Sequence, residues 1–419
     1  MTRPPEEPQL PPEPSREPPE PPTGMTVGRR FIQELTRGNV LVTLLSVVLA
    51  LLLGAVLIAA SDPRVREPAG YFFARPGDML SGIWTSVSQA YIALFEGSII
   101  NFRADTLAGA VRPFTETLTN ATPLIAAGLA VAIAFRAGLF NIGAEGQIIL
   151  GATFAGFLGF AIHLPPVIHL VVAVAGGLLG GAIWGGIVGV LKARTGAHEV
   201  IVTIMLNNIA AFLLLYLLGT AAFQRPGRQD PVSPFVDGTA ALPRLIPDSR
   251  VNLGFVLAIA AALVVWWVLE RSTTGFRLRA VGQNPNAART AGMSVGRTYV
   301  VVFLMAGALA GLAGAAEVLG TQRFLNSGIS GGLGFDAITV ALLGRSHPWG
   351  TVAAGLLFGA LRAGGVTMQA RTGTPVDLTL VIQALVVLFV AAPPLIRAIF
   401  RIRVRAAGGP VVTATKGWQ

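Results

Sequence analysis

The sequence contains no cysteine, only four histidines and only two lysines. Without cysteine the chain has neither a disulfide framework nor a thiolate metal site. The few histidines argue against a metal enzyme, and no paired carboxylates or Ser-His arrangement occur at a spacing usable for catalysis. Lys192 and Lys416 both lie outside any Gly-rich GxxxxGK[ST] loop of the kind that binds phosphates. We therefore expect no catalytic residue, no metal site and no cofactor on this chain, and any ATP that it uses must bind to another polypeptide.

Charged residues are also scarce: they make up 12% of the chain, against 53% hydrophobic residues and a mean hydropathy of +0.66. A soluble domain of this length does not need so much apolar sequence for its core, so the bilayer is the expected solvent. The net charge is +10. The arginines stand at the ends of apolar runs instead of forming a basic stripe, a pattern that orients a membrane protein and does not indicate nucleic-acid binding.

Apolar windows of about 20 residues, the length that crosses the hydrocarbon core as a helix, recur along the chain. Pro165-Pro166 divides the longest apolar stretch into two helices. A shorter segment at 334–344, with Asp336 near its start, predicts a broken or half-length helix. We predict an all-α, polytopic membrane protein with about ten transmembrane helices. The nine longer windows are 39–60, 118–135, 146–164, 167–191, 200–219, 252–269, 299–320, 349–366 and 378–396.

Arginines cluster before the first window and after the last, which by the positive-inside rule places both termini in the cytoplasm. The same alternation makes 61–117 and 220–251 extracellular connections. Within the first, 79–101 has apolar residues at helical spacing, and both an interfacial helix and a re-entrant segment remain open. We divide the chain into a disordered Pro-rich cytoplasmic head at 1–38, a transmembrane domain at 39–396 with a cytoplasmic loop at 271–298, and a basic cytoplasmic tail at 397–419.

The cytoplasmic loop encodes a short helix. Asn284 can cap it, Pro285 suits its first position, and Gly292 can end it. A helix of two turns is marginal alone, so we expect it to dock into another molecule. A solvated connector is the alternative. The residues that we assign to docking are Asn284, Pro285, Ala287, Ala288, Arg289 and Gly292.

Polar residues inside or beside the spans are candidates for lining a pathway, because their desolvation is costly unless they are paired or face water. Glu317 is the sharpest case, since it is ionisable and surrounded by Ala and Gly. Structural roles remain open for the others: Asn141 can cap a helix with Glu145 in its first turn, and Asn207 and Asn208 can bond across helices. The polar candidates are Asn141, Glu145, Gln147, Asn207, Asn208, Glu317 and Asp336.

Four stretches carry a family resemblance: GLFNIGAEGQ at 138–147, HEVIVTIMLNNIA at 198–210, TGFRLRAVGQNPNAARTAGM at 274–293 and GFDAITVALLGRSHPWG at 334–350. With them the chain resembles the permeases of ABC importers in the ribose and branched-chain amino acid group, in particular the nucleoside-uptake branch. The similarity extends from about residue 35 to 400. It implies a permease subunit in the bacterial plasma (inner) membrane that forms half of the translocation pathway for a nucleoside or related sugar-like solute.

The resemblance also implies partners: ABC ATPase subunits that hydrolyse ATP, a second permease subunit and an extracellular substrate-binding lipoprotein. In such permeases the loop that matches 274–293 carries the coupling helix, which inserts into the ATPase. A nucleoside is neutral, polar and aromatic, so Phe140 and Phe335 join the pathway candidates as faces on which a base can stack.

An ion-coupled secondary transporter is the main alternative, with Glu317 and Asp336 as proton or sodium sites. The predicted docking helix argues against it, because a proton-coupled carrier has no need of one. A membrane scaffold without a pathway would leave the broken helix at 334–344 unexplained. Dependence of uptake on an ATPase or on an ion gradient separates the two transport mechanisms.

Overall fold

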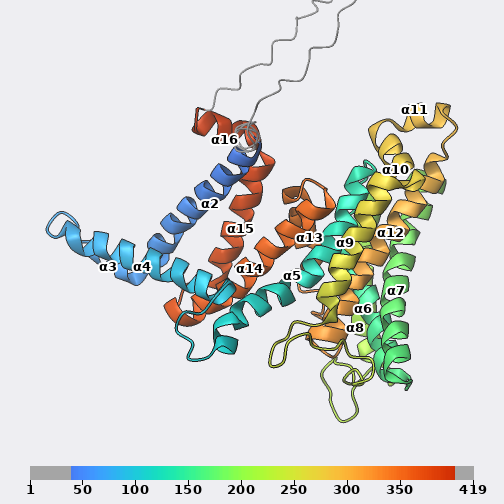
Figure 1. Ribbon diagram of the computed structural model, residues 1–419, viewed down its shortest axis with the longest axis horizontal. Helices are drawn as coiled ribbons and strands as arrows, with labels where there is room; N and C mark the ends of the chain where they lie inside the picture. The colour runs from blue at the N-terminus through green and yellow to red at the C-terminus, as the bar shows by residue number, and fades with distance from the viewer. Residues whose placement is uncertain (1–38, 402–419) are drawn as a thin grey trace, which may run out of the picture.

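The computed structural model describes residues 39–401, and apart from two isolated β-bridges all regular structure within them is helical (Figure 1). The predicted head at 1–38 and the tail from 402 onward lie outside the described residues. The elements are α2 (Asn39–Ser61), α3 (Pro63–Ala69), α4 (Pro76–Ser98), α5 (Leu107–Arg136), α6 (Ala144–Ala161), α7 (Pro166–Thr195), α8 (Glu199–Leu218), α9 (Leu253–Arg271), α10 (Thr273–Gln283), α11 (Pro285–Thr290), α12 (Val295–Ala316), the π-helical turn η1 (Glu317–Thr321), α13 (Leu333–Leu343), α14 (Pro348–Thr372), α15 (Val376–Ala391) and α16 (Pro393–Ile399).

Helices occupy all the predicted apolar windows. Among the described residues, eight helices are long and apolar enough to cross a membrane, and two shorter apolar helices, Leu333–Leu343 and Val376–Val390, lie at the remaining positions. The largest difference is at α5, which begins at Leu107 instead of residue 118. Its polar first turns escape a hydropathy window, because they line a cavity described below. The architecture is that of a multi-pass helical membrane protein.

Helix α5 lies at the centre of the packing: 83% of its apolar window is buried, and it contacts α9, α12, α13 and α14. Beside it, glycines let α6, α7 and α12 approach closely. A Cβ added at Gly181 would lie 2.2 Å from the carbonyl oxygen of Gly307, and one at Gly311 would lie 2.2 Å from that of Gly177. Small residues therefore set the spacing of these helices, as the Gly-rich spans predict.

The two ends of the molecule differ in what they carry. Figure 1 shows α10, α11 and α16 at one end, together with the start of α2, whereas the connection between α8 and α9 lies at the opposite end. That connection is held in place by His169 on α7, whose Nδ1 lies 2.7 Å from the Thr239 hydroxyl and whose Nε2 lies 2.9 Å from the carbonyl oxygen of Leu158. The described chain thus begins and ends on the side of α11.

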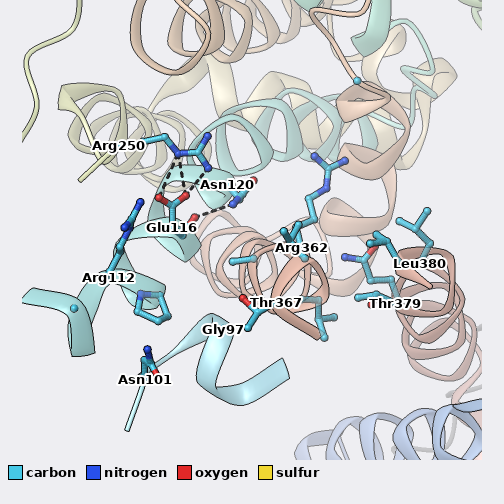
Figure 2. A pocket seen from close by; sticks show the side chains of 18 residues that line it. Gly97, Asn101, Arg112, Glu116, Asn120, Arg250, Arg362, Thr367, Thr379 and Leu380 are labelled. Atoms are coloured by element: carbon cyan, nitrogen blue, oxygen red, sulfur yellow. Dashed lines mark hydrogen bonds and ion pairs between the residues drawn. The ribbon is translucent and has the colours of Figure 1, made fainter. Parts of the chain in front are cut away.

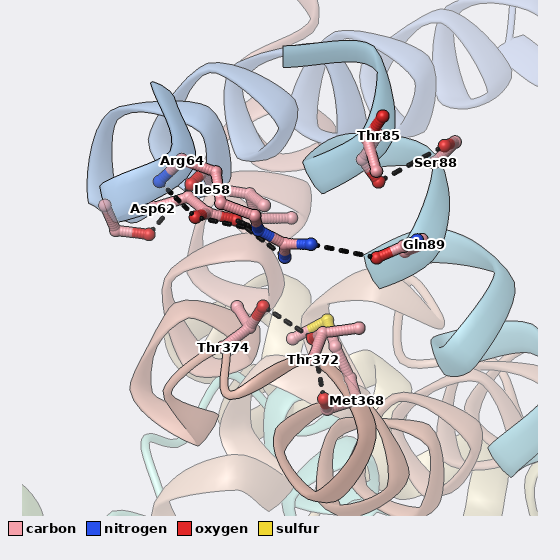
Figure 3. A network of polar contacts seen from close by, with 10 residues as sticks. Ile58, Asp62, Arg64, Thr85, Ser88, Gln89, Met368, Thr372 and Thr374 are labelled. Carbon is pink, nitrogen blue, oxygen red and sulfur yellow. Dashed lines mark hydrogen bonds and ion pairs between the residues drawn. The ribbon is translucent and has the colours of Figure 1, made fainter. Parts of the chain in front are cut away.

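The segment 79–101, left open between two placements, contains most of α4. Arg64 of α3 bonds to the Asp62 carboxylate and donates to Gln89 Oε1 at 3.2 Å, which ties α3 to α4 (Figure 3). Two turns further along α4, the buried carboxylate of Glu96 pairs with Arg371 at the end of α14. Polar contacts therefore fix the second half of α4 to its neighbours, and the position of α4 relative to the membrane stays a prediction.

Candidate transport pathway and coupling region

Helix α11 is formed by strong local signals. The Asn284 side chain accepts hydrogen bonds from the backbone N–H groups of Asn286 and Ala287, both at 3.0 Å, and Pro285 occupies the first helical position. Gly292 has a φ of +79°, and the N–H of Met293 reaches back to the Ala288 carbonyl at 3.0 Å. This left-handed turn closes the helix as the sequence predicts.

The two faces of α11 have different environments. Ala288 is 4% exposed and packs in a small apolar cluster with Val281 of α10 and Val295 of α12. Asn286, Ala287, Arg289 and Thr290 are exposed. Of the residues assigned to docking, Ala288 therefore faces its own chain and holds α11 against α10 and α12, while the exposed face is free to meet another molecule.

The helix α10, which precedes α11, makes a backbone contact with the junction of α5 and α6. A Cβ added at Gly282 would lie 2.6 Å from the carbonyl oxygen of Arg136, and one at Gly138 would lie 2.8 Å from the carbonyl oxygen of Gly282. Gly138 has a φ of +70°, a conformation that favours glycine. Backbone therefore meets backbone here, with no side chain between α10 and the α5–α6 junction that could yield.

A buried cluster of amides holds that junction. Asn141 and Gln147 exchange two hydrogen bonds of 3.0 and 3.2 Å, and each is 1% exposed. Asn207 of α8 accepts from the N–H of Gly146 at 2.9 Å and donates to the Ile142 carbonyl at 3.0 Å. The structure thus brings together three predicted pathway residues, with Asn207 joining Asn141 and Gln147 from a distant part of the sequence. Their polar groups are engaged with one another and with backbone, an arrangement that fixes the entry of α6.

The short helix α13 is held by two carboxylates. Glu145 in the first turn of α6 accepts a hydrogen bond of 2.7 Å from the N–H of Gly334. A carboxylate at this position satisfies a free backbone donor and interacts favourably with the positive end of the helix dipole. Asp336, in the first turn of α13, forms an ion pair of 2.5 Å with Arg362 of α14. Helix α13 is therefore connected to α6 at its start and to α14 on its flank.

The other predicted pathway residues are dispersed. Phe140 is 57% exposed and its ring lies edge-on to Phe135, with 5.2 Å between centroids. Phe335 is 54% exposed. Asn208 is exposed and donates to the Ile204 carbonyl of its own helix at 3.0 Å. Glu317 begins η1, and Gln322 donates to its carboxylate at 3.4 Å.

A cavity of about 670 Å³ lies at the end of the molecule opposite α11, between the start of α5, the end of α14 and α15 (Figure 2). Arg250 forms an ion pair with Glu116 on one wall, and Arg362 and Thr367 of α14 lie on another. The hydrogen bond with Glu116 raises the pKa of Arg250 against the effect of its burial, and the charge of Glu317 adds to the increase. The wall of the cavity thus carries hydrogen-bond donors and acceptors, and side chains of both positive and negative charge.

The residues that line this cavity differ from the predicted pathway candidates. Its polar lining residues are Asn101, Arg112, Glu116, Asn120, Arg250, Arg362, Thr367, Thr379 and Gln383. Two signals were present in the sequence. Glu116 and Asn120 stand four residues apart, on one face of a helix, and Arg362 interrupts the apolar window at 349–366. An arginine inside a membrane helix usually faces the protein interior or water, which is the case here.

Comparison with known proteins gives a consistent set of relatives. The family described as the permease component of branched-chain amino acid transport systems matches residues 114–391. The guanosine ABC transporter permease protein NupP of Bacillus subtilis is 38% identical over 367 residues, which cover 86% of this chain and 95% of the relative. The nucleoside ABC transporter permease protein NupB of Lactococcus lactis is 33% identical, covering 84% and 91%. The glucose ABC transporter permease protein TsgB13 of Haloferax volcanii is 39% identical over 66% of this chain and 75% of its own length.

Proposed function

This chain belongs to the permease-component family of branched-chain amino acid transport systems, and we propose that it forms half of the transmembrane pathway of an ATP-driven importer of nucleosides. Its relatives NupP and NupB are named for guanosine and nucleoside transport. Hydrolysis of ATP takes place on separate ATPase subunits, and a second permease and an extracellular binding lipoprotein complete the machine. The chain lies in the bacterial plasma membrane with ten spans and with both termini, α10 and α11 on the cytoplasmic side.

The observation that carries this proposal is the construction of α11. It is a short helix, capped at both ends, anchored through Ala288 and exposed on its opposite face. Six residues have too little surface to be stable alone, so the cluster with Val281 and Val295 keeps the helix rigid. A rigid, protruding element suits a part that receives force from another subunit.

The route of that force follows from the contacts. Movement of α11 with the ATPase carries α10 along, and Gly282 presses on the α5–α6 junction. The amide cluster around Asn141 moves with the junction, and Glu145 passes the displacement to α13. ATP binding and release thereby bias two arrangements of the spans, one open to each side of the membrane. A population shift of this kind needs only a difference in contacts between the two arrangements.

We place the entrance of the solute at the cavity opposite α11 and call it the outer cavity, because the proposed topology puts it on the extracellular side. Its volume of about 670 Å³ lies within the range of about 300 to 1,000 Å³ that is usual for small-molecule sites. Ribose hydroxyls and base edges are donors and acceptors, which Glu116, Asn120 and Arg250 complement. Because the binding lipoprotein selects the solute, weak contacts suffice here. Asp336 supports the wall of this entrance through its ion pair with Arg362.

The test is reconstitution in proteoliposomes with the second permease, the ATPase subunits and the binding lipoprotein. We expect uptake of labelled guanosine that requires ATP and every one of these components. It should persist when ionophores collapse all ion gradients, and other nucleosides but not glucose should inhibit it. Uptake by the permease without its ATPase, driven by a proton or sodium gradient, would instead establish the secondary transporter. Inhibition by glucose alone would keep the mechanism and replace the solute.

A further inference from the structure

A second cavity lies beside α11 but is not part of its exposed face. It has a volume of about 620 Å³ and is bounded by the first turns of α10, the turn that follows α11 and the first turns of α12. We call it the α10–α12 groove. Its polar lining side chains are Thr273, Thr274, Arg277, Ser294, Arg297 and Thr298.

The charges of the groove are all positive. Arg277 and Arg297 are exposed, and neither forms an ion pair with any residue in the described range 39–401. No acidic side chain is among the lining residues. Elsewhere on this end, by contrast, Lys192 is paired with Glu199 at 2.6 Å. Two guanidinium groups that share one concavity without a carboxylate provide a site for an anion with several oxygens.

Hydroxyl groups complete the polar lining. Among the residues described, the side chains of Thr273, Thr274 and Ser294 make no hydrogen bond, although Ser294 occupies the N-cap position of α12. Thr298 donates to the Ser294 carbonyl at 3.0 Å and is already satisfied. Three free hydroxyls beside two arginines match the acceptors of a phosphodiester together with the hydroxyls of a headgroup.

Apolar residues make up the rest of the lining. Phe276 is 57% exposed, and Val301, in the second turn of the apolar helix α12, is 37% exposed. Leu304, one turn further along α12, is 39% exposed. On α12, the order Arg297, Val301, Leu304 therefore leads from the charged part of the groove to exposed apolar side chains further along this apolar helix. A soluble anion would leave these apolar side chains uncovered, whereas a phospholipid has a charged headgroup that is continued by acyl chains.

We propose that the α10–α12 groove binds the headgroup of an anionic phospholipid of the cytoplasmic leaflet, with Arg277 and Arg297 on the phosphate and Phe276 and Val301 along the first acyl segments. Basic pockets between helices on the cytoplasmic side are a known type of lipid site. The groove borders the turn that connects α11 to α12. A bound lipid would therefore stiffen the base of the coupling helix.

The test uses the purified full-length chain and native mass spectrometry with added phosphatidylglycerol or phosphatidylcholine. We expect Arg277→Gln/Arg297→Gln to weaken phosphatidylglycerol binding by about tenfold or more, and Arg277→Lys/Arg297→Lys to retain most of it. The matched control is Arg194→Gln/Arg345→Gln, which removes the same charge from exposed arginines outside the groove. It should bind phosphatidylglycerol as the wild type does, and phosphatidylcholine should bind weakly to every variant.

Three results would overturn the proposal. The first is equal loss of phosphatidylglycerol binding in both Gln pairs, because binding would then follow net charge alone. The second is displacement of the lipid by millimolar inorganic phosphate, which would make the groove a site for soluble anions. The third is unchanged lipid binding with lost assembly of the ATPase in Arg277→Gln/Arg297→Gln, which would assign the groove to the subunit interface. None of these measurements requires transport, so failure here is distinct from failure of the proposed function.

Discussion

Replacement of Gly282 by alanine is the sharpest perturbation of the proposed transmission route. The new Cβ would lie 2.6 Å from the Arg136 carbonyl oxygen and 2.7 Å from the Ala137 carbonyl carbon. Carbon–oxygen contacts are comfortable at about 3.3 Å or more, so α10 and the α5–α6 junction must separate by ~0.7 Å. Overpacking of this size costs about 1 to 3 kcal/mol. If the strain falls mainly on one of the two transport states, the ratio of their populations changes by about 5- to 150-fold.

The assay compares ATP-driven uptake and ATP hydrolysis in the same proteoliposomes. We expect Gly282→Ala to retain assembly and hydrolysis while the number of solute molecules moved per ATP falls at least about fivefold. The matched control is Gly296→Ala in α12, on the same side of the molecule, where the added Cβ would meet Ala193 at an ordinary 3.5 Å. Equal coupling ratios in the two variants would refute the role of the α10–α5 contact.

Three further predictions follow from individual contacts. Arg250→Gln removes the ion pair with Glu116; because one partner is more than half exposed, the melting temperature should change by less than about 2 °C, while solute uptake, measured in proteoliposomes, falls. Glu145→Gln weakens the cap on α13 and should cost about 1 kcal/mol of stability, measured by thermal unfolding in detergent. Burial raises the pKa of Asp62, but its hydrogen bonds and the neighbouring positive charge outweigh this effect and leave the pKa below its usual value. The ionised Asp62 therefore stabilises the fold above about pH 4, and this stabilisation is lost as the pH falls further. The melting temperature of Asp62→Asn should consequently decrease less on acidification than that of the wild type.

The positions of the helices were largely predictable, because their signals are local. Pro165-Pro166 separates α6 from α7, and the Asn284-Pro285 cap and Gly292 bound the short helix α11. Such features act within one turn of the residues that encode them, so a single sequence displays them. The apolar windows similarly reflect a requirement of each span on its own.

The contacts that relate helices to one another were not predictable. Glu145 and Gly334 are separated by 189 residues, and Arg250 and Glu116 by 134. Whether a polar residue is satisfied by a neighbour or faces a cavity depends on that long-range packing. Asn207 is therefore found within a buried amide cluster, whereas Arg362, inside an apolar window, lines the outer cavity.

The central claim, that the exposed face of α11 receives force from an ATPase subunit, is tested most directly by site-directed cross-linking. The absence of native cysteine means that a single introduced thiol is the only one on the chain. In the assembled complex, Asn286→Cys and Arg289→Cys should each cross-link to the ATPase through a short bifunctional reagent, and the yield should change when ATP is added. Arg228→Cys, in the exposed connection at the opposite end, should give no such product. Absence of cross-links from both α11 positions, or equal cross-linking from position 228, would contradict the account.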